Sequence, residues 1–212
     1  MTPPGYRLGE EIANRITHGV GALLAIAGSA VLVVLAALRG TAWHIVGCAV
    51  FGGSLVVLYT ASTLYHSITH IRARSVLQVL DHSAIYFLIA GTYTPFMLVT
   101  LRGPWGWSLF GVVWGAAVAG ISLGTAVGRR LRILRVALYI IMGWVGVVAL
   151  RPLVATLGMT GTGLVLAGGV AYTTGVAFYA SKRLPYSHAI WHLFVLAGSA
   201  LHYVAVLVYV VP

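Results

Sequence analysis

Seven apolar segments joined by short polar connections restrict the fold of this chain more than any other feature. Each segment is close to the roughly 20 residues that an α-helix needs to cross a bilayer. Only 8% of the residues are charged and 60% are hydrophobic, whereas a soluble domain averages about 25% charged residues. A water-soluble core could not hide so much apolar surface, so the solvent must be lipid.

We therefore expect an all-α fold, a seven-transmembrane helix bundle that forms one membrane domain over residues 1–212. Its expected helices are Gly19–Leu38, Trp43–Tyr65, Ala84–Leu101, Trp105–Val127, Ile133–Leu150, Gly161–Ala180 and Ala189–Val211. The first run is longer than the usual core of a secretory signal and lacks a clear cleavage site, so we interpret it as a retained helix.

The basic residues predict the orientation of this bundle. Ten of them would lie on the side of the N-terminus and three on the other side. The positive-inside rule then places the N-terminus in the cytoplasm and the C-terminus outside, in a multi-pass protein of the plasma (inner) membrane. The net charge of +10 lies in the connections, which argues against nucleic acid as a partner. The ten are Arg7, Arg15, Arg72, Arg74, Arg129, Arg130, Arg132, Arg135, Lys182 and Arg183, and the three are Arg39, Arg102 and Arg151.

Two histidines at the start of the last apolar run are the first candidates for chemistry. His188 and His192 are four residues apart, so on a helix both imidazoles share one face, about 6 Å apart along the axis. This spacing suits two nitrogen ligands of one metal ion, as in helical zinc motifs. Two interfacial histidines wetted by lipid headgroups are an equally good explanation of the pair alone. The single cysteine, Cys48, excludes an intrachain disulfide and a thiolate cluster.

The predicted topology brings more polar residues into the same leaflet. The second helix would end there at His66, and the third would start there just after Asp81, the only aspartate. His66 could supply a third nitrogen, although it also forms a four-residue pair with His70, for which we favour a solvated role. Asp81 could cap its helix or orient a ligand or a water. Ser62, one turn before His66, could act beside it or bond back to its own helix.

Two more histidines, a proline and the glycines of the fourth run carry further predictions. His18 could stand behind the ligands, and His202 lies too deep along the last helix to share their metal, so we interpret it as a hydrogen-bonding group of the interior. Pro95 predicts a kink in the third run. The glycines of the fourth run have small-xxx-small spacings and should let a neighbouring helix approach closely; they are Gly111, Gly115, Gly120, Gly124 and Gly128.

The pattern resembles a known superfamily. Ser62 and His66 as S-x3-H, then Asp81, then His188 and His192 as H-x3-H, resemble the progestin and adipoQ receptor superfamily. The stretches EEIANRITHGVGALLAIAG, ASTLYHS, DHSAIYFLIAGTYTPF and SHAIWHLF resemble its bacterial branch, the haemolysin III-like proteins. The resemblance covers nearly the whole chain, and nothing in the five positions departs from the family pattern.

The resemblance implies a Zn2+ ion held by His66, His188 and His192. It also implies a water held near the metal by Asp81, with Ser62 alongside. In the animal members this site is associated with ceramidase-like hydrolysis of a lipid amide, whereas the bacterial branch takes its name from haemolytic activity. The animal receptors carry an extramembrane N-terminal region that is missing here, which argues against binding of a hormone.

Two functions from different classes follow. In the first, the protein is a zinc-dependent hydrolase of lipid amide or ester bonds, in which Asp81 moves the proton and Ser62 positions the water or stabilises the oxyanion. A membrane lipid would be the substrate and would enter sideways from the inner leaflet. In the second, the zinc is a structural clamp in a receptor-like or membrane-lytic protein without catalysis. A pore ranks below both, because the apolar runs offer no ring of repeated charge.

Overall fold

The computed structural model describes residues 8–127, 132–181 and 184–212, and all regular secondary structure in these ranges is helical. Arg7, Arg129, Arg130, Lys182 and Arg183, on which the orientation prediction partly rests, lie outside the described residues. The elements are α1 (Leu8–Arg39), α2 (Ala42–Ser67), α3 (Ile71–Pro95), η1 (Phe96–Thr100), α4 (Pro104–Val127), α5 (Arg132–Trp144), η3 (Val145–Ala149), α6 (Leu150–Ala180) and α7 (Ser187–Tyr209).

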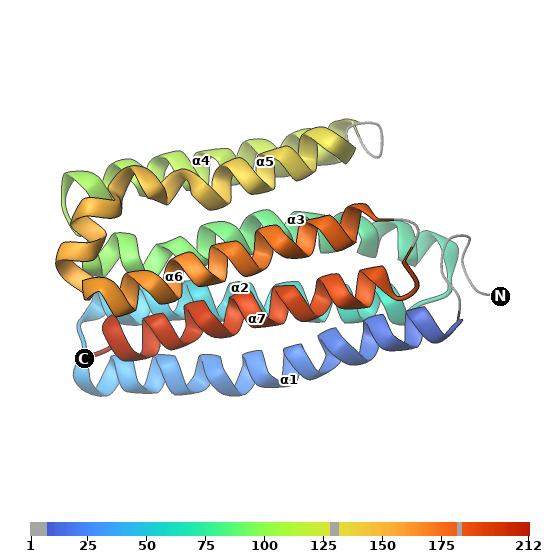
Figure 1. The fold of residues 1–212 in the computed structure, drawn as a ribbon. Helices are drawn as coiled ribbons and strands as arrows, with labels where there is room; N and C mark the ends of the chain where they lie inside the picture. The colour runs from blue at the N-terminus through green and yellow to red at the C-terminus, as the bar shows by residue number, and fades with distance from the viewer. Residues whose placement is uncertain (1–7, 128–131, 182–183) are drawn as a thin grey trace.

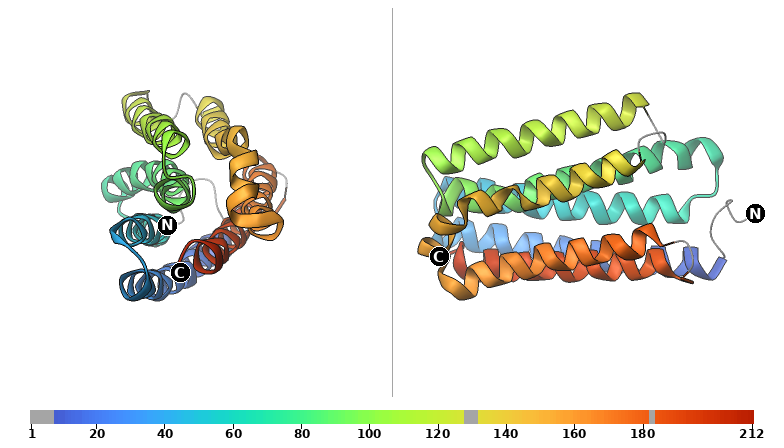
Figure 2. Two further views of the ribbon diagram at one scale, coloured as in Figure 1. Left: turned by 90° about the vertical axis from the view of Figure 1, so that its left-hand side faces the viewer. Right: turned by 45° about the horizontal axis from the view of Figure 1, so that its top comes forward.

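The helices form a closed ring (Figure 1, Figure 2). Each contacts the helix that follows it in the sequence, and α7 contacts α1. The most extensive packing joins α1 to α2, α2 to α3, and α6 to α7. Figure 1 also shows that α1 begins at the end of the bundle opposite to the end where α7 finishes. The ends of α2 and α6 and the starts of α3 and α7 lie together at the end where α1 begins.

Six helical segments of the described residues are long and apolar enough to cross a membrane. The longest is Ile133–Ala180, with 48 residues. It contains the 3-10 turn η3 and the backbone break at Gly158, whose φ of 67° is left-handed. Glycine adopts that conformation without a Cβ penalty. The chain reverses direction in this segment, and α5 and α6 run in opposite directions in Figure 1.

Local sequence sets where α2 begins and α3 ends, at the end of the bundle opposite to the start of α1. The backbone N–H of Thr41 donates to Nδ1 of His44 at 3.0 Å, which closes a capping box at the start of α2. Pro95 ends α3, and the chain continues as the π-helical turn η1, in which the N–H of Leu101 donates to the carbonyl of Phe96 at 2.8 Å. The kink predicted at Pro95 therefore takes the form of a change to π-helical geometry.

The outer surface of the ring is apolar, as lipid requires. Leucine, isoleucine and methionine side chains point outward along several helices, with Leu23 71% exposed and Met159 77% exposed. Tryptophans gather at the end where α2 and α4 begin: the rings of Trp43 and Trp107 lie 5.6 Å apart, and the Arg102 guanidinium lies over Trp43. Such an aromatic cluster is typical of a membrane interface.

Several helices are longer than the apolar runs predict. Helix α1 begins at Leu8 rather than Gly19, and the helix of the third run begins at Ile71 rather than Ala84. A hydropathy pattern marks the part of a helix in hydrocarbon, and a helix can extend beyond that part in either direction. The extra turns of α1 and α3 contain Glu11 and Asp81, both of which matter for the site.

The small-xxx-small spacing of α4 meets a close neighbour at one position within the chain. Of the glycines with that spacing that the structure describes, Gly120 faces the ring of Tyr86, whereas Gly111, Gly115 and Gly124 face open space. Gly128 lies outside the described residues. Arg135 lines a cavity between α3, α4 and α5, and its Nε atom is buried.

Candidate metal centre

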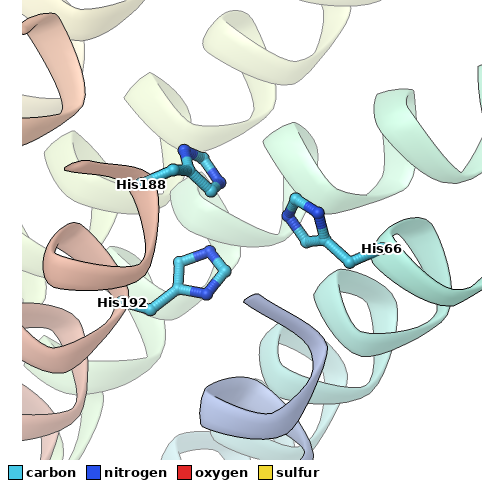
Figure 3. Close-up of side chains that lie close together, drawn as sticks. All are labelled: His66, His188 and His192. Atoms are coloured by element: carbon cyan, nitrogen blue, oxygen red, sulfur yellow. The ribbon is translucent and has the colours of Figure 1, made fainter. Parts of the chain in front are cut away.

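Three histidines from two helices meet inside the ring, near the end where α1 begins (Figure 3). One potential ligand atom from each of His66, His188 and His192 lies within 4.8 Å of those of the other two. The ring centroid of His66 is 5.1 Å from that of His188 and 5.3 Å from that of His192. His66 and His192 are buried and His188 is half-buried. The structure therefore brings together the three residues predicted as metal ligands.

The helix geometry explains this convergence. His188 and His192 occupy successive turns of one face of α7, and their ring centroids are 4.6 Å apart. His66 lies in the last turn of α2. Helix α1 lies between and contacts both α2 and α7, so these two helices face each other across a narrow part of the ring.

The donor set fits a zinc ion. Imidazole is a common zinc ligand, and three of them around one ion are typical of catalytic sites, which leave one position open. Zinc–nitrogen bonds of about 2.0–2.1 Å need nitrogens somewhat closer together than 4.8 Å, a difference that rotation of the side chains can supply. Buried polar atoms without a hydrogen-bond partner in the described residues also lie near the histidines. Among them are the amide nitrogen and oxygen of the Asn14 side chain and both ring nitrogens of His18. Buried polar groups of this kind need partners.

Helix α1 contacts the outward nitrogens of two of the three histidines. Nδ1 of His66 lies 2.6 Å from Oε2 of Glu11. Nδ1 of His192 lies 3.1 Å from Oγ1 of Thr17 and 3.2 Å from the backbone carbonyl of Asn14. In each ring Nε2 is then the nitrogen directed toward the other histidines. Such contacts orient the ligands of a metal site.

Glu11 is a residue of the site that the sequence motifs did not predict. The structure places Glu11 on the buried face of α1, together with Asn14 and His18. These residues are spaced three and four apart, and the same face continues as Gly21 and Ala25. This helical period of polar residues, continuous with the small residues of the first run, was the signal that could have found Glu11.

Asp81 lies inside α3 rather than at its start. The helix begins ten residues earlier, at Ile71, and the interpretation of Asp81 as a helix cap is therefore wrong. Asp81 is buried, with 9% of its surface exposed. It lines the same cavity as Ser62, His188 and His192.

Ser62 lies beside Asp81. Its hydroxyl is buried and makes no hydrogen bond to its own helix, although that bond was the simpler alternative for this residue. It lines the same cavity as the Asp81 carboxyl. The hydroxyl and the carboxyl therefore form a polar pair at the cavity wall, next to the histidines.

The other histidines have separate surroundings. His18 stacks on His192, with ring centroids 3.5 Å apart, which agrees with a position behind the ligands. His70 is exposed and accepts a hydrogen bond from the N–H of Ala73 at the start of α3. His202 is buried and its ring stacks on that of Tyr172. Its Nδ1 atom lies 2.8 Å from the carbonyl oxygen of Gly198. His202 therefore matches the predicted hydrogen-bonding group of the interior.

A mostly apolar cavity extends from the histidines along the inside of the ring. Its volume is about 160 Å³. Ser62, Asp81 and His188 line it near one end of the bundle, and Leu101, Leu109 and Leu153 line it toward the other. Between them lie Tyr172 and Thr92. The cavity thus joins a polar end with titratable groups to a long apolar interior.

Comparison with known proteins identifies the family. A family model described as haemolysin-III related matches residues 6–203. The chain belongs to this family. It is 50% identical over 203 residues to Hemolysin-3 of Bacillus cereus, with 96% of this chain and 93% of the relative covered.

More distant relatives come from animals and plants. The human monocyte to macrophage differentiation factor is 30% identical over 206 residues, with 93% of this chain and 83% of the relative covered. The rice heptahelical transmembrane protein ADIPOR2 is 32% identical over 177 residues, with 73% and 77% covered. These matches connect the bacterial branch to the progestin and adipoQ receptor superfamily, as the sequence motifs predict. The protein is a multi-pass protein of the bacterial plasma membrane.

Proposed function

We propose that this protein is a zinc-dependent hydrolase that cleaves an amide or ester bond of a membrane lipid. The observation that carries the proposal is the convergence of three imidazoles with Asp81 and Ser62 at one end of a long apolar cavity. His66, His188 and His192 would hold the ion. When bound, zinc would supply Lewis-acid chemistry that polarises a carbonyl and lowers the pKa of water.

The side chains around the cavity have distinct roles in this proposal. The apolar wall binds the hydrocarbon chain of the lipid and excludes water from it. Asp81 accepts a proton from the attacking water and returns it to the leaving amine or alcohol. The Ser62 hydroxyl lines the cavity with the Asp81 carboxyl, where it would hold that carboxyl in place and donate to the oxygen on which negative charge develops.

The proposal includes seven membrane crossings with a cytoplasmic N-terminus. One straight helix of 48 residues would be about 72 Å long at about 1.5 Å per residue, more than twice the ~30 Å of a hydrocarbon core. Two crossings by Ile133–Ala180 remove this conflict. The start of α1 and the end of α7 lie at opposite ends of the bundle, which also fits an odd number of crossings. The excess of basic residues near the start of α1 supports its cytoplasmic placement.

The second candidate is a receptor-like or membrane-lytic protein in which the metal only clamps α2 to α7. The name of the Bacillus cereus relative, Hemolysin-3, favours this alternative. A clamp, however, needs neither a buried carboxyl nor an apolar cavity beside it. Asp81 and Ser62 line that cavity together, and this arrangement supports the hydrolase.

Purified protein tests the proposal with two probes, a fluorescent ceramide and a fluorescent diacyl phospholipid. We expect wild type to release fatty acid from at least one probe. Asp81→Asn preserves the shape of the side chain but cannot accept the proton, so turnover should fall by about 10²–10⁴-fold with zinc content unchanged. Glu10→Gln makes the same exchange at a residue outside the cavity and serves as the control. Unchanged turnover in zinc-loaded Asp81→Asn would contradict the proposed role of Asp81.

A further inference from the structure

Glu11 joins three helices at the histidine cluster. Its Oε2 atom lies 2.6 Å from Nδ1 of His66 on α2, and its Oε1 atom lies 2.6 Å from Nη2 of Arg74 on α3. The side chain of His66 is 0% exposed and that of Glu11 is 8% exposed. The Arg74 guanidinium also lies over the ring of Tyr65, 4.7 Å from its centroid. Each oxygen of the carboxylate thus has one partner of its own.

We infer that Glu11 is the positioning residue of the metal site, acting through His66; this inference rests on the proposed zinc site. An ionised carboxylate can only accept hydrogen bonds, so Nδ1 of His66 must carry the proton that lies between them. Nε2 is then left with a lone pair for the ion. In Figure 3 one ring nitrogen of His66 points toward His188 and His192. A carboxylate at the outer nitrogen also makes the imidazole a stronger ligand.

Arg74 gives the carboxylate a fixed place. A carboxylate bonded only to an imidazole could rotate, but the second contact at Oε1 holds Glu11 from the opposite side. The charge of Arg74 also offsets the cost of burying the carboxylate when His66 is neutral. The arrangement orders four groups in sequence: Tyr65, Arg74, Glu11 and His66.

A simple tether between helices would not need this geometry. Arg74 and Glu11 already form an ion pair between α1 and α3 without His66. The contact to His66 adds an orientation, and α1 repeats it at His192, whose Nδ1 lies near Thr17 and the Asn14 carbonyl. Two metal-facing rings from different helices are therefore set by one helix that supplies no ligand itself.

Zinc affinity of the purified protein in detergent tests the inference. Wild type, Glu11→Gln and Glu10→Gln are stripped of metal and titrated with Zn2+ against a chromophoric chelator. Glu11→Gln should bind zinc about 10–100-fold more weakly, because the carboxamide lacks the charge of the carboxylate. Glu10 accepts a hydrogen bond from the backbone N–H of Tyr186, and Glu10→Gln, the same exchange one residue away from Glu11, should match wild type. Glu11→Asp retains the charge on a shorter side chain. Its zinc affinity should lie between those of wild type and Glu11→Gln.

A second readout needs no variant of Glu11. In metal-free wild type labelled with 15N-histidine, the His66 signal, assigned by its loss in His66→Ala, should show the proton on Nδ1. A His66 protonated only on Nε2 would overturn the inference, and so would equal zinc affinity in wild type and Glu11→Gln. If wild type itself binds no zinc, the proposed function fails and the inference fails with it. If zinc binds normally to both proteins, only the inference fails.

Discussion

Two adjacent glycines of α2 give a sharp test of the packing between α1 and α2. A Cβ atom built at Gly52 would lie 2.5 Å from Oγ, 2.7 Å from Cβ and 3.1 Å from Cα of Ser29 on α1. A Cβ atom built at Gly53 would meet nothing within 4 Å. Gly52→Ala and Gly53→Ala are thus the same chemical change in the same helix, one against a neighbouring helix and one in open space.

The expected magnitudes follow from these distances. Replacing glycine by alanine inside a helix stabilises it by roughly 0.5–1 kcal/mol, and this gain applies to both variants. Carbon atoms in contact prefer about 3.5–4.0 Å, so at Gly52 rotation of the Ser29 hydroxyl cannot relieve the clash with Cβ and Cα. The helices must separate, at a cost of about 1–3 kcal/mol. We expect Gly52→Ala to be less stable than Gly53→Ala by about 1–3 kcal/mol, because the helix gain cancels in the difference.

The assay is reversible unfolding in mixed micelles of a mild detergent and sodium dodecyl sulfate, followed by circular dichroism and tryptophan fluorescence. The free energies of unfolding of both variants are compared with that of wild type under the same conditions. Equal stabilities of the two variants would refute the close approach of α1 to α2. Zinc affinity should also fall in Gly52→Ala alone, because a shift of α1 moves Glu11 away from His66.

The remaining predictions concern topology. Alkaline phosphatase, which is active only outside the cytoplasm, should be active when fused after Pro212, and inactive when fused after Ser181 at the end of α6. A cytoplasmic reporter such as green fluorescent protein should give the opposite pattern, and activity of the phosphatase at both positions would exclude a membrane crossing by α7.

The sequence was sufficient to place the three histidines in one leaflet, whereas their choice as a ligand set came from the family resemblance. The four-residue spacing of His188 and His192 fixes their common face on α7, and the alternation of apolar runs places the end of α2 and the start of α7 in the same leaflet. These two arguments use only helix geometry and the direction of each crossing, and both are insensitive to where a helix begins. For that reason the error of eleven residues at the start of α1, Leu8 instead of Gly19, did not affect them.

The surroundings of the histidines could not be predicted in the same way. Helix ends in polar sequence have no hydropathy signal, so neither the buried position of Glu11 nor the place of Asp81 inside α3 was predicted. Their actual roles depend on which face of α1 and α3 points inward, and this is decided by packing against other helices. The small-xxx-small glycines of α4 show the same limit: their spacing permits close approach, but of those that the structure describes Gly120 alone has a neighbour within the chain that uses it.

Metal analysis of the purified protein tests the central claim most directly. The geometry of the three histidines predicts one zinc ion per chain in wild type. His192→Ala should lose this ion, because the substitution removes a buried ligand. His70→Ala, in which an exposed histidine outside the cluster is removed, should retain a full complement of zinc. Wild-type protein without stoichiometric metal after purification and zinc loading, or His192→Ala with full zinc content, would contradict the account.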